Sequence, residues 1–177
     1  PGKYSTSVGG QSDAVCLDCT AGKFSASYGA DMQDKCNLCG TCKYSTSVGA
    51  DSANTCQDCD VGKYLSIEGA SAGSMCVDCD KGKYSTALAA ASNSTCQSCA
   101  KGKFSTTDGA WSVTNCIDCA AGTYSTVSAA KSDLTCLNCK AGTHSTRLGA
   151  VSPDTCENCV PGKYSTSVGG QSDAVCL

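Results

Sequence analysis

Residues 16–36 read CLDCTAGKFSASYGADMQDKC, a Cys-x-x-Cys pair followed by a Gly-Lys-aromatic-Ser segment, a Gly-Ala step and the first cysteine of the next pair. This arrangement recurs every 20 residues without insertion or deletion. Such a period indicates a repeat architecture in which each unit packs on its neighbours. We therefore divide the chain into repeats at 1–19, 20–39, 40–59, 60–79, 80–99, 100–119, 120–139 and 140–159, with a truncated ninth copy at 160–177.

Each repeat carries one large ring in a fixed slot, which we expect to cover a disulfide and touch the neighbouring repeat. The slot holds Tyr4, Phe24, Tyr44, Tyr64, Tyr84, Phe104, Tyr124, His144 and Tyr164. A glycine two residues earlier suits a turn with positive φ, and the intervening segments are rich in β-formers and too short for helices. We predict small disulfide-rich β repeats in an elongated solenoid or rod of tandem 20-residue units, with short hairpins and almost no helix.

Composition favours an extracellular location for the chain. Eighteen of the 177 residues are cysteine, above the roughly 8–10% that marks a disulfide scaffold. With two Phe and one Trp, the chain lacks the side chains for a large apolar core, so cross-links must offset chain entropy. We predict an extracellular or cell-surface protein. Because the sequence starts at Pro1 without Met or a signal-peptide pattern, we interpret it as a mature segment of something longer.

Charge and residue content argue against several function classes. The net charge is −3 and the charges are scattered singly, so we expect no nucleic-acid partner. No apolar run approaches the roughly 18 residues of a membrane span. A single histidine and no compact fold to hold it make a Ser-His-Asp arrangement implausible. We predict no enzyme activity, no catalytic residues, no cofactor and no metal.

Residues 1–17 recur without change at 161–177, although the intervening repeats have diverged. The simplest interpretation is a super-repeat of eight units, of which this chain is one period plus an overlap. The parent array is then longer than this chain. A cloning artefact is the alternative.

Three interpretations compete for the Cys-x-x-Cys pairs. Adjacent pairs have the spacing of Cys₄ zinc sites, but zinc would group them two by two and create a 40-residue alternation that the sequence lacks. Redox catalysis needs a helix N-terminus in a thioredoxin-like setting, which is not apparent here. We favour a ladder of disulfides, each contributing about 3 kcal/mol by loop closure.

The proposed ladder joins the second cysteine of one pair to the first of the next. The bonds are Cys19–Cys36, Cys39–Cys56, Cys59–Cys76, Cys79–Cys96, Cys99–Cys116, Cys119–Cys136, Cys139–Cys156 and Cys159–Cys176. Bonding within each pair is the rival connectivity, which sequence alone leaves open. In the ladder, Cys16 pairs with a cysteine upstream of Pro1. Cys42, which replaces the turn glycine, is left over as a free thiol or as a lateral link between chains.

The stretch from Cys159 to Thr166, Cys-Val-Pro-Gly-Lys-Tyr-Ser-Thr, and its variant from Cys59 to Ser66 resemble the ephrin-receptor-like cysteine-rich repeat, whose pattern is Cys-x-x-Cys-Pro-x-Gly-x-Tyr-Ser. That repeat is similar to the first module type of tumour-necrosis-factor-receptor ectodomains. The resemblance covers the whole chain and implies extended extracellular modules with the bonding pattern given above. This sequence usually lacks the proline after the cysteine, and it lacks modules with extra cysteines, which weakens the case for a growth-factor-like ligand.

Several polar positions suggest modification or turn roles. Asn93-Ser94-Thr95 is an N-glycosylation sequon, and Asn54-Thr55-Cys56 is a weak variant. The Ser-Thr pairs after the ring suit O-glycans or simply hydrogen-bond in strands and turns. These pairs are Ser5–Thr6, Ser45–Thr46, Ser85–Thr86, Ser105–Thr106, Ser125–Thr126, Ser145–Thr146 and Ser165–Thr166. We interpret His144 as a packing variant. The carboxylates Asp18, Asp58, Asp78 and Asp118 are interpreted as turn residues that bond nearby amides.

Our leading functional hypothesis is a structural extracellular protein that forms a surface filament, appendage or matrix fibre and carries glycans, with itself as partner. The alternative is a ligand-binding stalk or ectodomain of a surface receptor or adhesin. A third hypothesis, an intracellular zinc-binding array, would require bound metal and free thiols.

Overall fold

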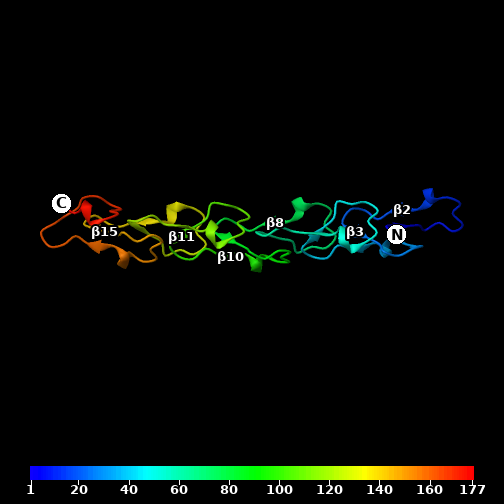
Figure 1. The fold of residues 1–177 in the computed structure, drawn as a ribbon, viewed down its shortest axis with the longest axis horizontal. Coiled ribbons are helices and arrows are strands. Elements are labelled where there is room, and N and C mark those ends of the chain that lie inside the picture. The colour runs from blue at the N-terminus through cyan, green and yellow to red at the C-terminus, as the bar shows by residue number, and fades with distance from the viewer. The chain divides into compact units, whose positions relative to one another are not determined.

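The computed structural model describes all residues 1–177. By contacts they form two compact units, one of Pro1–Asp78 with Ala87–Thr95 and the other of Cys79–Thr86 with Cys96–Leu177. Both units are successions of short hairpins and turns (Figure 1).

Eight two-stranded antiparallel hairpins, one in each of the first eight repeats, carry the regular structure. The Lys-aromatic dipeptide pairs with the two residues between the cysteines, so Lys3 lies opposite Asp18 and Tyr4 opposite Leu17. The pairs are β1 (Lys3–Tyr4) with β2 (Leu17–Asp18), β3 (Lys23–Phe24) with β4 (Asn37–Leu38), β5 (Lys43–Tyr44) with β6 (Gln57–Asp58), β7 (Lys63–Tyr64) with β8 (Val77–Asp78), β9 (Lys83–Tyr84) with β10 (Gln97–Ser98), β11 (Lys103–Phe104) with β12 (Ile117–Asp118), β13 (Thr123–Tyr124) with β14 (Leu137–Asn138), and β15 (Thr143–His144) with β16 (Glu157–Asn158). The predicted class of small disulfide-rich β repeats in tandem is confirmed.

A three-residue 3₁₀ turn lies before the first cysteine of every repeat. The turns are η1 (Asp13–Val15), η2 (Gln33–Lys35), η3 (Ala53–Thr55), η4 (Gly73–Met75), η5 (Asn93–Thr95), η6 (Val113–Asn115), η7 (Asp133–Thr135), η8 (Pro153–Thr155) and η9 (Asp173–Val175). A serine usually precedes the turn, and its hydroxyl can accept an amide N–H, as Ser52 does from Asn54 at 3.1 Å. None of these turns is long enough, or apolar enough, to cross a bilayer.

Backbone hydrogen bonds tie each repeat to the next two along the chain. In the first unit, Gly2 N–H donates to Ser25 O at 2.7 Å and Ser5 N–H to Ala30 O at 2.9 Å. Gly49 N–H reaches back two repeats to Cys19 O at 2.8 Å. The second unit has the same pattern: Gly102 N–H donates to Ser125 O at 2.9 Å, and Gly149 N–H to Cys119 O at 2.8 Å. These hydrogen bonds join backbone atoms only, so the pattern, which we call the backbone ladder, tolerates divergent side chains.

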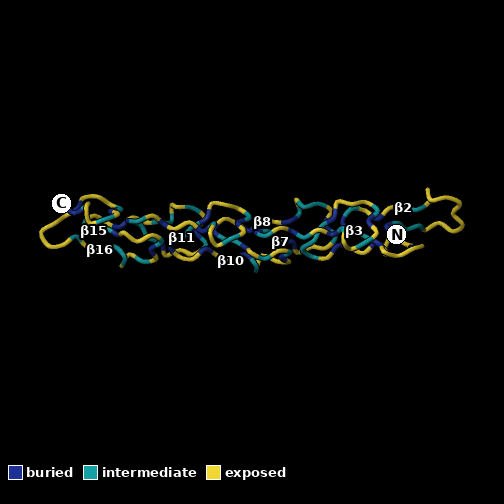
Figure 2. The backbone as a smooth tube through the Cα atoms, in the orientation of Figure 1, coloured by how far each residue is buried: buried dark blue, intermediate teal, exposed yellow.

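The buried residues are small, as Figure 2 shows by the short buried stretches along the tube. They are chiefly the disulfide cysteines, the alanine of the Gly-Ala step and the serine after the ring. Ser45, for example, is fully buried, and its hydroxyl accepts the N–H of Ser47 at 3.3 Å. Of the two interpretations of the Ser-Thr pairs, hydrogen bonding in turns applies to these buried serines, because a buried hydroxyl cannot carry a glycan. The threonine members, such as Thr46, are exposed.

Candidate functional site

Eight disulfides form the repeated chemical feature of the chain. They join Cys19–Cys36, Cys39–Cys56, Cys59–Cys76, Cys79–Cys96, Cys99–Cys116, Cys119–Cys136, Cys139–Cys156 and Cys159–Cys176. Every bond spans 17 positions in sequence, with Cα–Cα distances of 5.6–5.8 Å. This is the connectivity that we proposed from the sequence, and the rival bonding within each pair does not occur.

Local backbone geometry explains why a Cys-x-x-Cys pair does not close on itself. The two residues between the cysteines form a strand, and side chains on an extended strand alternate between its faces. Cysteines three positions apart, such as Cys36 and Cys39, therefore point in opposite directions. Cys36 bonds to the preceding repeat and Cys39 to the following one. Because each of these sulfurs is bonded to a cysteine of another repeat, it offers no thiolate to zinc or to redox catalysis.

Two residues of the aromatic slot, Tyr44 and His144, lie against disulfides, as expected for this slot. The ring of Tyr44 packs on a buried cluster that includes Cys59 and Cys76, together with Leu65. In the slot of the eighth repeat, His144 takes the same place: its Nδ1 lies 3.9 Å from Cys176 Sγ. His144 is thus a packing variant that brings a titratable nitrogen to a disulfide.

Glycine in the turn slot permits a close approach between repeats. A Cβ on Gly102 would lie 2.2 Å from Gly149 O, and the Gly102 φ is +76°. Cys42 occupies this slot with a φ of +62°. It keeps the backbone ladder, since Cys42 N–H donates to Leu65 O at 2.9 Å. Its thiol is free and half-buried, and its bonding to another chain stays a prediction.

Cross-strand ion pairs account for the recurrent carboxylates. Lys43 Nζ lies 2.5 Å from Asp58, and Lys63 Nζ lies 2.6 Å from Asp78. Lys103 is paired with Asp118 at 2.7 Å and Lys3 with Asp18 at 3.5 Å. The interpretation of these aspartates as turn residues is therefore wrong: they lie on strands, opposite lysines. In the other repeats the residue opposite is uncharged, as in Lys23 opposite Leu38 and Thr123 opposite Asn138.

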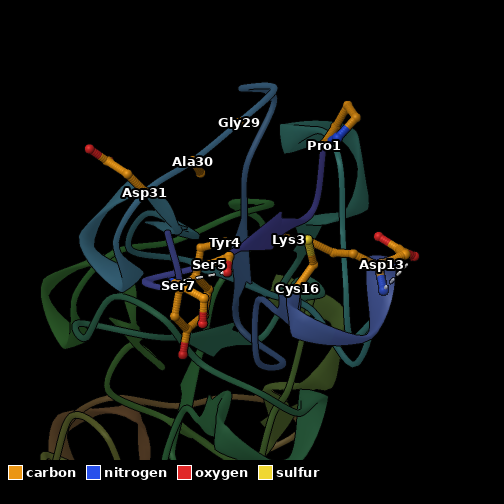
Figure 3. A pocket seen from close by; sticks show the side chains of 10 residues that line it. All are labelled: Pro1, Lys3, Tyr4, Ser5, Ser7, Asp13, Cys16, Gly29, Ala30 and Asp31. Carbon is orange, nitrogen blue, oxygen red and sulfur yellow. Dashed lines mark hydrogen bonds and ion pairs between the residues drawn. The ribbon is translucent and has the colours of Figure 1, made fainter. Parts of the chain in front are cut away.

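Cys16, the other free cysteine, lies in an open hollow of about 400 Å³. Figure 3 shows its side chain beside Lys3, with Asp13 nearby and the Gly29–Ala30 segment across the hollow. Lys3 lies 3.7 Å from Asp13 and 3.5 Å from Asp18. These carboxylates, Asp13 first, raise the pKa of the Lys3 ammonium. The thiol of Cys16 is half-buried, so a partner approaching through the hollow can reach it.

The sequon lies where a glycan could be attached. Asn93 is the first residue of η5 and is exposed. The Thr95 hydroxyl donates to Ser92 O at 2.9 Å. In the weaker sequon, Cys56 is bonded to Cys39, so its third position has no free thiol.

Comparison with known families finds one matching family model. Residues 69–116 and 113–156 each match the family model described as "Tyrosine-protein kinase ephrin type A/B receptor-like". No curated protein matches the sequence.

Proposed function

Since residues 69–156 are ephrin-receptor-like cysteine-rich repeats, we propose that this chain is a non-catalytic structural protein of the extracellular surface that forms a filament, appendage or matrix fibre. Such repeats and so many disulfides are typical of extracellular domains. The fibre, the self-association and the glycans do not follow from the family match and are part of the proposal.

The observation that carries the proposal is the repeated backbone ladder. Each repeat bonds to the next two through the same amides and carbonyls, as Gly49 does to Cys19 and Gly149 to Cys119. Repeats of this kind can be added without any change in their bonding. An array with few large apolar side chains inside, held by one disulfide per repeat, suits a load-bearing or spacing role.

Exposed apolar side chains support self-association. One slot, in the loop after the first strand of each hairpin, holds a large exposed apolar residue in most repeats. Its members are Val8, Tyr28, Val48, Leu88, Leu148 and Val168. Recurrent exposed apolar side chains on a secreted protein favour contact with another surface. The simplest partner with a matching period is another copy of the same chain.

The exposed Asn93 supports glycosylation. We expect the chain secreted from eukaryotic cells to carry one N-glycan, so that peptide-N-glycosidase increases its electrophoretic mobility. Asn93→Gln should abolish the shift, whereas Asn54→Gln, in the variant sequon, should leave it unchanged. A shift that persists in Asn93→Gln would exclude this site.

Electron microscopy of the purified, oxidised chain tests the fibre. We expect regular filaments whose axial period corresponds to a whole number of 20-residue repeats. A receptor or adhesin stalk is the second candidate, favoured by the receptor named in the family description. Monodisperse single chains at every concentration, by microscopy and light scattering, would exclude the fibre and favour the stalk.

A further inference from the structure

One slot changes in two neighbouring repeats of the second unit. The first residue of the hairpin is lysine in the first six repeats, whereas the seventh and eighth have Thr123 and Thr143. Each threonine hydroxyl turns back to its own loop: Thr123 Oγ1 donates to Ala120 O and Thr143 Oγ1 to Lys140 O, both at 2.8 Å. The volume that a lysine side chain takes up in the other repeats is therefore free at these two positions.

The disulfides beside the two threonines are uncovered. The slot residue lies diagonally across the hairpin from the first cysteine of its own repeat, as Figure 3 shows for Lys3 and Cys16. In repeats with lysine in this slot, the bonded first cysteines are 5–9% exposed, because a lysine stem can cover apolar surface while its ammonium stays in water. Cys136 and Cys156, in the threonine repeats, are half-buried. Cys136 has complete repeats on both sides, so the threonine accounts for the difference.

A hollow lies over each uncovered disulfide. Both hollows are lined by the ring of the preceding repeat, the threonine and the uncovered cysteine, which are Phe104, Thr123 and Cys136 in one and Tyr124, Thr143 and Cys156 in the other. Their volumes are about 330 and 360 Å³, in the range of roughly 300–1,000 Å³ that small-molecule sites have. We call them the Phe104 hollow and the Tyr124 hollow.

The Tyr124 hollow also carries polar groups that are free to bind. Asn138 and Asn158, each opposite a threonine in its own hairpin, both line it. Neither their side-chain amides nor the Tyr124 hydroxyl makes a hydrogen bond within the chain, whereas the Tyr84 hydroxyl donates to Gln97 at 3.0 Å. The hollow thus combines a half-buried ring with three unpaired polar side chains.

The charges that line the Tyr124 hollow cancel. Lys140 and Asp154 are its only charged residues. One carboxylate oxygen of Asp154 accepts the Ser152 hydroxyl at 2.7 Å, which leaves the other oxygen to accept from a ligand. The Phe104 hollow has no such balance, because Asp118 and Asp133 line it without a basic residue. The Tyr124 hollow therefore suits a ligand that has no net charge.

We propose that the Tyr124 hollow binds a neutral hexose residue of a glycan. The flat faces of a pyranose ring carry C–H groups that can pack on the Tyr124 ring and on Pro153, which also lines the hollow. The hydroxyls on the rim of the sugar each donate and accept hydrogen bonds, as do the asparagine amides and the tyrosine hydroxyl. This inference goes beyond the proposed function, because the site lies within one chain and needs no fibre.

The test is an NMR titration of the ¹⁵N-labelled 177-residue chain with the methyl glycosides of glucose, galactose and mannose. At least one should give saturable shifts at millimolar concentration in Tyr124 and in the side-chain amides of Asn138 and Asn158. Glucosamine and glucuronate, which are charged, should bind no more tightly. The absence of saturable shifts with all three neutral glycosides would overturn the site, and binding of the charged sugars alone would overturn the neutral class.

Matched variants tie the binding to the missing lysine. Thr143→Lys restores the residue of other repeats, fills the Tyr124 hollow and should abolish the shifts. Thr123→Lys should leave the affinity unchanged, because the Phe104 hollow stays open beside the equivalent Lys103. Tyr124→Phe, the residue of two other repeats, removes only the hydroxyl and should weaken binding several-fold.

The spectrum of each variant also reports whether it folds. Binding that survives Thr143→Lys, in a chain whose remaining resonances are unchanged, would overturn the proposal. An affinity that Tyr124→Phe leaves unaltered would remove the tyrosine hydroxyl from the site and contradict the hydrogen bonding on which the assignment depends. Monodisperse chains that bind a glycoside would refute the fibre alone, and filaments that bind none would refute this site alone.

Discussion

Tyr4 and its identical counterpart Tyr164 differ in burial: Tyr4 is half-buried, whereas Tyr164 is 64% exposed. Tyr164 nevertheless exchanges backbone hydrogen bonds with Leu177, in the register in which Tyr4 pairs with Leu17. Other features are the same in the two copies. Turns η1 and η9 both form, and Gly9 and Gly169 have φ angles of +71° and +69°. The turn is therefore set by local sequence. The burial of the aromatic side chain depends on which neighbours the copy has.

The two copies are packed on opposite sides. Gly2 is closed against Gly49 O of a following repeat, whereas Gly162 has open space around it. Conversely, Gly170 is buried and its carbonyl accepts the N–H of Ser145 from the preceding repeat, whereas Gly10 is exposed. Each repeat thus has two distinct faces. Its stability is mainly a sum of its own hairpin and the interfaces that it makes, as in other linear repeat arrays.

The largest expected difference between the two copies comes from the disulfide. The double variant Cys159→Ser/Cys176→Ser should cost the repeat at 161–177 about 3 kcal/mol of local stability, because its loop is no longer closed. Cys16→Ser should have no measurable effect. Hydrogen exchange, followed on peptides that extend beyond the identical 17 residues, tells the copies apart. Unchanged protection in the double variant would mean that interfaces alone hold this repeat.

The second difference comes from the turn glycines. The φ angles of Gly2 and Gly162 are +74° and +86°, and a side chain at such an angle costs about 1 kcal/mol. Gly162→Ala should therefore lower the free energy of unfolding by only that amount. Gly2→Ala also drives a Cβ to 2.1 Å from Gly49 O, which adds about 1–3 kcal/mol of overpacking. Chemical denaturation of the two variants measures the difference. Equal losses would show that the close approach at Gly2 relaxes without cost.

The sequence predicts the covalent frame of this chain better than its noncovalent contacts. The 20-residue period and the ring slot led directly to tandem β repeats and to rings packed on disulfides, as Tyr44 is on Cys59 and Cys76. A 20-residue period in the sequence does not indicate which repeats are in contact in the folded chain. The backbone hydrogen bond from Gly49 N–H to Cys19 O, two repeats back, could therefore not be predicted from the sequence.

The aspartate between the cysteines was interpreted wrongly because the sequence does not give the register in which the two strands of a hairpin pair. Asp58 looks like a turn residue until the dipeptide between the cysteines is seen to be a strand opposite Lys43. The serine after the ring looks like a surface hydroxyl, but this position is buried in most repeats, and in the fourth repeat Leu65 occupies it. The change of both positions at Thr123 and Asn138 hints at the pairing, but Lys23 opposite Leu38 shows that the two positions do not always change together.

The smallest expected difference concerns Lys3 and its identical counterpart Lys163. Lys3 has Asp13 at 3.7 Å and Asp18 at 3.5 Å, whereas Lys163 donates to Cys176 O at 3.3 Å. Because the two carboxylates raise the pKa of Lys3, its ion pairs stabilise the folded chain at neutral pH. That contribution is lost as the pH rises from the ordinary lysine pKa through the raised one. Lys3 is exposed, so the effect on unfolding should be slight and weaker in high salt. NMR titration of the lysine side chains should show the raised pKa of Lys3, and Asp13→Asn/Asp18→Asn should return it to the ordinary range. An unchanged pKa in that variant would mean that the carboxylates are too well solvated to hold the proton.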